Sequence, residues 1–196
     1  ITNKVQQIVP LLENIINTAV EKRVCYWKNS PFEDIRELSN DERGNWGEAV
    51  VHDLFDQYTN TRVEWNENVN TMQQDGIYDM KINSHRVEIK TSFGGHSSCW
   101  QHENIYRTPL WDKCIFVDVD RDSIYFTCIS HSEMTWDTQH PQLKKKATLR
   151  KAQDDKWKFD FSRTSLKNGL EHNLTRIWDL EEPDAQLINW WESKFA

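Results

Sequence analysis

One short stretch, "DGIYDMKINSHRVEIKTS", combines core-type residues with charged residues at spacings that could do chemistry. The turn "NSH" separates two candidate strands, and side chains alternate between the two faces of a strand. Val87 and Ile89 would therefore point into a core, while Glu88 and Lys90 would point together to the opposite face. If the two strands pair in antiparallel fashion, Asp79 can lie beside Glu88.

A bound divalent cation would account for two neighbouring carboxylates, which otherwise repel each other and titrate abnormally. Mg²⁺ prefers such oxygen ligands and keeps water in the rest of its shell. Lys90 could orient a water molecule or stabilise charge that develops on a phosphate. The alternative is a solvated surface hairpin, because the pattern acid–x–Lys occurs four times in the chain. The context favours a metal site, since Glu48 lies on a preceding predicted helix, at the rim of its apolar face.

The segments "IYDMKI" and "RVEIKTS", with "RGNWGE" before them and "WDKCIFVDVD" after them, resemble the PD-(D/E)xK nuclease superfamily. Type II restriction endonucleases and Holliday junction resolvases belong to it. The resemblance covers roughly residues 40–130. The proline that usually precedes the catalytic aspartate is absent here, because Tyr78 precedes Asp79. Asp75 therefore stays open as an alternative metal ligand, although Asp79 lies within the strand and fits the pattern better.

The resemblance implies an α/β fold with a central mixed β-sheet flanked by helices, a restriction-endonuclease-like core. It implies that Glu48, Asp79 and Glu88 bind Mg²⁺, for which Mn²⁺ could substitute, and that Asp79, Glu88 and Lys90 are catalytic. The implied reaction is hydrolysis of double-stranded DNA to 5′-phosphate and 3′-hydroxyl ends by a homodimeric type II restriction enzyme. A structure-selective or repair nuclease and a catalytically silent DNA-binding module on the same core remain open.

Two further segments are candidates for contacts with DNA. The segment "KKKATLRK" carries five basic residues in eight and could bind phosphates, with a solvated loop as the alternative. The segment "FGGHSSCWQH" directly follows the motif strand and could read groove edges, with a flexible connection as the alternative. The candidate contact residues are Ser97, Ser98, Gln101, Lys144, Lys145, Lys146, Arg150 and Lys151.

Periodicity predicts the elements that must position these residues. An amphipathic helix is expected near residues 5–20, and a second helix after Ser39, which forms a capping box with Glu42. The sequence further predicts strands at 113–119 and 123–129, and helices at 97–108, 164–170 and 184–195. These elements fit a single domain over residues 1–196, with a nuclease core at about 40–130 and a C-terminal elaboration at about 135–196.

The composition is that of a globular protein: 37% of the 196 residues are apolar and 28% are charged. The net charge of −7 argues only weakly against nucleic-acid binding, because local charge matters more than the sum. Four widely spaced cysteines without a C-x-x-C pair do not indicate a disulfide framework. No run approaches the length of a membrane span, and the first residues do not read as a signal peptide. We expect a cytoplasmic protein without membrane contact.

Overall fold

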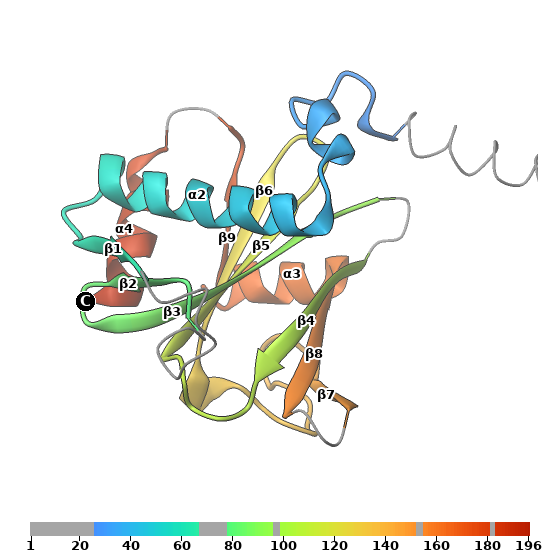
Figure 1. Cartoon of the computed structure of the whole chain (residues 1–196), viewed down its shortest axis with the longest axis vertical. Helices are drawn as coiled ribbons and strands as arrows, with labels where there is room; N and C mark the ends of the chain where they lie inside the picture. The colour runs from blue at the N-terminus through green and yellow to red at the C-terminus, as the bar shows by residue number, and fades with distance from the viewer. Residues whose placement is uncertain (1–25, 67–77, 96–98, 152–154, 181–182) are drawn as a thin grey trace, which may run out of the picture.

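Two β-sheets of different size organise the part of the chain that the computed structural model describes, which comprises residues 26–66, 78–95, 99–151, 155–180 and 183–196 (Figure 1). The chain has the predicted α/β class, with a mixed sheet and flanking helices. The elements follow in the order η1 (Glu33–Glu37), α2 (Asn40–Tyr58), β1 (Val63–Trp65), β2 (Met80–Ile82), β3 (His85–Phe93), β4 (Cys99–Tyr106), β5 (Lys113–Val119), β6 (Ile124–Ser130), η4 (His131–Glu133), β7 (Thr148–Lys151), β8 (Lys156–Ser162), α3 (Arg163–Glu171), β9 (Thr175–Trp178) and α4 (Ala185–Phe195).

The larger sheet has six strands in the order β1-β2-β3-β5-β6-β9. Strands β3 and β5 run parallel, with Glu88 opposite Cys114 and Lys90 opposite Phe116. All other neighbouring pairs in this sheet are antiparallel. The parallel pair requires a crossover between β3 and β5, and the chain makes it through β4, which belongs to the smaller sheet.

Both faces of the larger sheet are covered, so β5 is apolar almost throughout rather than alternating between apolar and polar residues. Ile115 and Val117 pack into a core shared with α2 and α4. Cys114 and Phe116 pack into a second core, shared with the small sheet and α3. Figure 1 shows α2 on one side of the large sheet and the small sheet on the other. A side chain on β3 or β5 therefore faces either the α2 layer or the small sheet.

The smaller sheet has the order β4-β8-β7, and its first strand corrects a prediction. The helix expected at 97–108 is instead strand β4, within the described residues from 99 onward. Trp100, His102 and Ile105 point inward and are buried, while Gln101 and Asn104 are exposed. Pairing with β8, about sixty residues later in the chain, fixes this strand, and local periodicity cannot register so distant a partner.

Other predicted elements match the structure closely. Helix α2 begins after Ser39 with the expected capping box, in which Ser39 Oγ accepts from the Glu42 amide at 3.3 Å and the Glu42 carboxylate accepts from the Ser39 amide at 2.7 Å. The strands expected at 113–119 and 123–129 and the last two helices are also present. The helix predicted near residues 5–20 lies outside the described residues. Among the described helices, none has both the length and the apolar character needed to cross a membrane.

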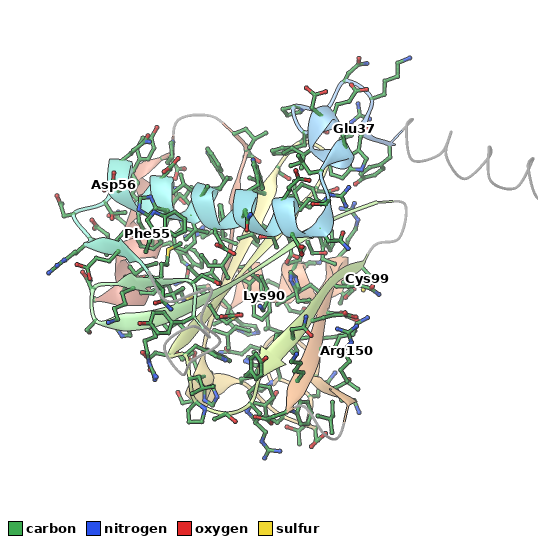
Figure 2. The ribbon with its side chains drawn as sticks, in the orientation of Figure 1. Glu37, Phe55, Asp56, Lys90, Cys99 and Arg150 are labelled. Carbon is green, nitrogen blue, oxygen red and sulfur yellow. The ribbon has the colours of Figure 1, made fainter. Side chains whose placement is uncertain are left out.

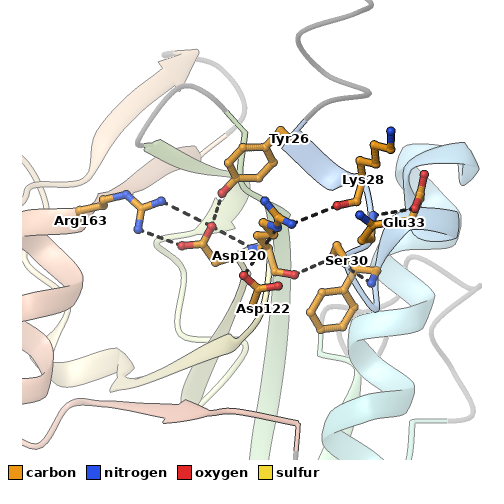
Figure 3. A network of polar contacts seen from close by, with 10 residues as sticks. Tyr26, Lys28, Ser30, Glu33, Asp120, Asp122 and Arg163 are labelled. Carbon is orange, nitrogen blue, oxygen red and sulfur yellow. Dashed lines mark hydrogen bonds and ion pairs between the residues drawn. The ribbon is translucent and has the colours of Figure 1, made fainter.

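A polar network attaches the first described residues to the turn between β5 and β6 (Figure 3). The Tyr26 hydroxyl donates to the Asp120 carboxylate, which also forms an ion pair with Arg163 at 2.9 Å. The Arg121 guanidinium donates to the carbonyl of Lys28 at 3.1 Å. Burial, together with the hydrogen bond to Asp120, raises the pKa of Tyr26 to about 12, so this hydroxyl remains a donor at neutral pH. The network fixes the chain that leads into α2.

Candidate active site

The hairpin of β2 and β3 forms as the sequence predicted. The strands are antiparallel, with Met80 opposite Val87, and the same register places Asp79 against Glu88. Val87 and Ile89 lie in the core under α2, as expected. Tyr78 packs into the other core, although strict alternation along a strand would place it on the same face as Met80. Strand β2 begins only at Met80, so strict alternation does not apply to Tyr78.

Hydrogen bonds on both sides of the backbone hold Asp79 in place. Its amide donates to the Val87 carbonyl at 2.9 Å, and its carbonyl accepts from the Asn66 amide at 3.0 Å. Its carboxylate Oδ2 accepts from the Ile89 amide at 2.6 Å. The carboxylate thus accepts the hydrogen bond that a backbone carbonyl of a neighbouring strand would otherwise accept. Its other oxygen, Oδ1, could bind a ligand.

Glu88 and Lys90 form a close ion pair on the face opposite Val87. Glu88 is 5% exposed, and its Oε2 has no hydrogen-bond partner among the described residues. Burial raises the pKa of Glu88 to about 8, against the opposing effect of Lys90. Burial works against the Lys90 ammonium, but the carboxylates of Glu88 and Asp79 outweigh it and raise the pKa of Lys90. At neutral pH, Lys90 is therefore a cation with a fixed position.

Helix α2 brings Glu48 to the same region through a close contact with β3. Gly47 packs directly on Thr91, and a Cβ added to Gly47 would lie 1.8 Å from Thr91 Oγ1. The absence of a side chain at Gly47 lets the helix approach the strand at that point, so the next residue, Glu48, comes close to the hairpin. Burial, followed by repulsion from Asp79, raises the pKa of Glu48 to about 7. Glu48 is thus at the rim of the buried face, as predicted.

A cleft of about 920 Å³ connects these groups with the small sheet. Within the described residues, β2 pairs with β3 only as far as Val87, and the residues of β3 from Ile89 to Phe93 line the cleft. Lys90 lies on β3 at the centre of the molecule, and Arg150 lies across from it on the small sheet (Figure 2). The residues that line the cleft are Asn40, Asp41, Arg43, Gly44, Asn45, Glu48, Asp79, Ile89, Lys90, Thr91, Ser92, Phe93, Cys99, Gln101, His102, Glu103, Asn104 and Arg150.

The predicted DNA contacts are only partly gathered at this cleft. Gln101 and Arg150 line it, whereas Lys144, Lys145 and Lys146 do not. The three lysines lie in the turn segment before β7, where the Lys144 amide bonds back to the His140 carbonyl. Ser97, Ser98 and Asp75 lie outside the described residues, as does the side chain of Lys151. Arg43, Glu103 and Asn104 also line the cleft but were not predicted. They belong to no sequence motif, and only the fold brings the small sheet and the first turns of α2 to the cleft.

The predicted set of three metal-binding carboxylates is not assembled. Among the described residues, no three His, Cys, Asp or Glu side chains are grouped so as to hold a metal ion. The Lys90 ammonium engages Glu88, which does not line the cleft, so two of the three predicted metal ligands, Glu48 and Asp79, line it. Their mutual repulsion fits a hard cation, and so does Oδ1 of Asp79, which takes part in no hydrogen bond among the described residues. Mg²⁺ needs only one or two protein carboxylates besides water.

This arrangement puts a fixed ammonium group beside two carboxylates at the floor of an open, polar cleft. Such a set can bind a cation–phosphate pair and stabilise negative charge that develops on a phosphate oxygen. No protein-family model matches the chain, and comparison with curated proteins and with solved structures finds no match.

Proposed function

We propose that the protein is a Mg²⁺-dependent DNA endonuclease of the PD-(D/E)xK type, with a restriction-endonuclease-like core. The proposal rests on one observation: the β2–β3 register brings Asp79 and Lys90 together beside Glu48 at the floor of a cleft, with Glu88 in contact with Lys90. The product ends would be a 5′-phosphate and a 3′-hydroxyl. The biological form would be a homodimer that cuts both strands of a specific duplex sequence, as a type II restriction enzyme does.

Each residue has a separate role in this proposal. Asp79 and Glu48 would hold the Mg²⁺ ion, whose chemistry is to polarise the phosphate and to lower the pKa of a bound water. Lys90 lines the cleft and would donate hydrogen bonds to the attacking water and to a phosphate oxygen. Glu88 lies behind Lys90, where its carboxylate orients the ammonium group. The partly buried setting strengthens these charge interactions relative to water.

The side chains on two walls of the cleft are of kinds that bind nucleic acid. Arg150 and Gln101 come from the small sheet, and Arg43 comes from the first turns of α2. Guanidinium groups suit phosphate oxygens, and amide side chains such as that of Gln101 suit base edges. A strand lying in the cleft would therefore contact both walls while its scissile phosphate lies at Lys90.

The first test is cleavage of plasmid and phage DNA with Mg²⁺ or with EDTA. We expect discrete fragments with Mg²⁺ only, and a loss of about hundredfold or more in rate for Lys90→Ala and Glu48→Gln. Lys81→Ala is the matched control, because Lys81 is on the same hairpin in a second acid–x–Lys pattern but is exposed. Cleavage by Lys90→Ala at the parental rate would remove these residues from the mechanism, and circular dichroism checks that each variant is folded.

A second candidate is a nucleic-acid-binding module without catalysis. One observation favours it: Lys90 engages Glu88, and no group of three metal-binding side chains exists among the described residues. This candidate predicts binding of DNA without cleavage under Mg²⁺, Mn²⁺ or any other divalent cation. The same assay should therefore include branched DNA and RNA, because cleavage of branched DNA alone would instead indicate a structure-selective nuclease.

A further inference from the structure

Glu103 on β4 bridges two cations on the small sheet. Its Oε2 lies 2.6 Å from Arg150 Nη1, and its Oε1 lies 3.8 Å from Lys158 Nζ. Lys158 Nζ also lies 3.4 Å from Asp160 Oδ2. The same Arg150 nitrogen donates to Asn104 Oδ1 at 3.1 Å. One carboxylate thus uses both oxygens, each facing a different cation. A phosphodiester group presents two non-bridging oxygens in a similar way, and a guanidinium group binds either anion.

Two irregularities of the small sheet bring these side chains together. The register of β4 against β8 shifts between His102 and Ile105, so that Glu103 and Asn104 lie opposite Lys158. The register of β7 against β8 shifts between Leu149 and Lys151, which makes Arg150 the extra residue of that strand. Bulges re-aim side chains and are common beside functional sites. Here, the register shifts of the two outer strands accompany the contact between Arg150 of β7 and Glu103 of β4.

This place borders the cleft that contains Lys90. Glu103, Asn104 and Arg150 all line the cleft, on the wall that faces β3. The side chains of Glu103 and Arg150 are 37% and 42% exposed, so solvent or a ligand can reach them. An ion pair with such exposure contributes about 1 kcal/mol or less. A phosphate could therefore displace the Glu103 carboxylate at little cost, and Glu103 could turn into solvent.

We propose that Arg150, Lys158 and Asn104 form a binding site for a backbone phosphate of a nucleic-acid strand, and that Glu103 occupies this site in the unbound protein. The inference rests on the proposed function, because the strand is the one whose scissile phosphate lies at Lys90. Glu103 acts as an internal anion that competes with the substrate. It lowers affinity for nucleic acid and leaves the chemistry at Lys90 untouched.

The test is the affinity for a fluorescently labelled DNA duplex, its single strand and an RNA of the same sequence, measured by anisotropy in EDTA. We expect Glu103→Gln to tighten binding about two- to tenfold, since the variant keeps the size of the side chain but removes the carboxylate from Arg150 and leaves Lys158 with Asp160 as its acidic partner. Arg150→Gln and Lys158→Gln should weaken binding. In the double variant of Glu103→Gln with Arg150→Gln, the gain in affinity should largely disappear, because the guanidinium that would bind the phosphate is absent.

Glu171→Gln is the matched control, because it removes the same charge from an exposed residue at the end of α3. An equal gain in this control, or a gain from Glu103→Gln that survives loss of Arg150, would overturn the proposal in favour of a general charge effect. No gain with any nucleic acid, or a gain seen only as inorganic phosphate binding, would overturn it as well. EDTA prevents metal-dependent cleavage, so binding is measured separately from cutting. A protein that shows the expected binding pattern in EDTA but does not cut DNA with Mg²⁺ would contradict the nuclease and leave the phosphate site standing.

Discussion

Lys90 and Glu88 illustrate how a buried ion pair constrains its own residues. Their side chains are 22% and 7% exposed, so removal of one partner leaves the other charge without compensation. We expect Lys90→Ala to lower the free energy of unfolding by about 3 kcal/mol. The double change of Glu88→Leu with Lys90→Met should be close to the parent or more stable, because it removes both charges. Urea denaturation measures both effects, and a fully stable Lys90→Ala would mean that the pair is not buried in solution.

The raised pKa of Glu48 predicts how stability depends on pH in the absence of metal. Burial, followed by repulsion from Asp79, raises this pKa to about 7 from its ordinary value of 4.5. The folded protein therefore binds more protons than the unfolded chain between about pH 4.5 and pH 7. Stability from this group is full below this window and is lost as the pH rises through it.

Mg²⁺ should reverse this loss, because a cation compensates the ionised carboxylates. We expect Mg²⁺ to raise the melting temperature more at pH 8 than at pH 6. Glu48→Gln should flatten the dependence on pH and reduce the effect of Mg²⁺. Thermal unfolding of both proteins across this pH range checks the prediction, and a Mg²⁺ effect that is equal at both pH values would contradict it.

Helix α2 sets the position of Glu48 through Gly47, and a second glycine in the same helix provides a control. Gly47→Ala would force a Cβ into Thr91, so the helix must move away from β3 and carry Glu48 away from Asp79. We expect lower stability and a loss of any Mg²⁺-dependent activity. Gly44 has nothing within 4 Å of an added Cβ, so Gly44→Ala should raise helix stability by about 0.5–1 kcal/mol. Equal behaviour of the two variants would show that the contact with Thr91 does not position the helix.

The elements that sequence analysis predicted correctly are those whose signals are local. The capping box at Ser39 predicts the start of α2. The alternation around Glu88 predicts β3 and the face on which its charged residues lie. Strands β1, β7, β8 and β9 escaped prediction, because their partners decide them. Strand β9, for example, pairs with β6 at the end of the sheet order, with Thr175 Oγ1 lying 2.8 Å from Thr127 Oγ1 across the pair.

The same distinction applies to the candidate site. Asp79, Glu88 and Lys90 were predictable, because one hairpin carries all three. The place of Arg150 and Glu103 on one cleft wall was not, because it depends on two bulges in a sheet whose strands are far apart in sequence. The basic run at 144–151 was conspicuous in the sequence, and its Arg150 lines the cleft, whereas Lys144, Lys145 and Lys146 lie outside it. Charge density along a chain therefore predicts less about a binding surface than the register of the strands beneath it.

At the scale of the whole molecule, the net charge of −7 opposes the approach of a polyanion, so binding must depend on local cations. Three cationic residues, Arg43, Lys90 and Arg150, line the cleft against four acids, Asp41, Glu48, Asp79 and Glu103. Neutralising about three phosphates gives a slope of about −3 for the logarithm of affinity for duplex DNA against the logarithm of salt concentration.

We expect that slope, with modest affinity, when binding is measured in EDTA over a range of monovalent salt. Mg²⁺ should tighten binding, because a cation held by Glu48 and Asp79 would turn the acidic floor of the cleft into a phosphate-binding surface. Replacing Lys144, Lys145 and Lys146 together by Gln should then leave the slope nearly unchanged, whereas Arg150→Gln should reduce its magnitude by about 1. A slope near −6 whose magnitude decreases by about 3 in the triple variant would instead mean that duplex DNA extends beyond the cleft to the turn before β7. The binding surface would then be wider than the site at Lys90 requires.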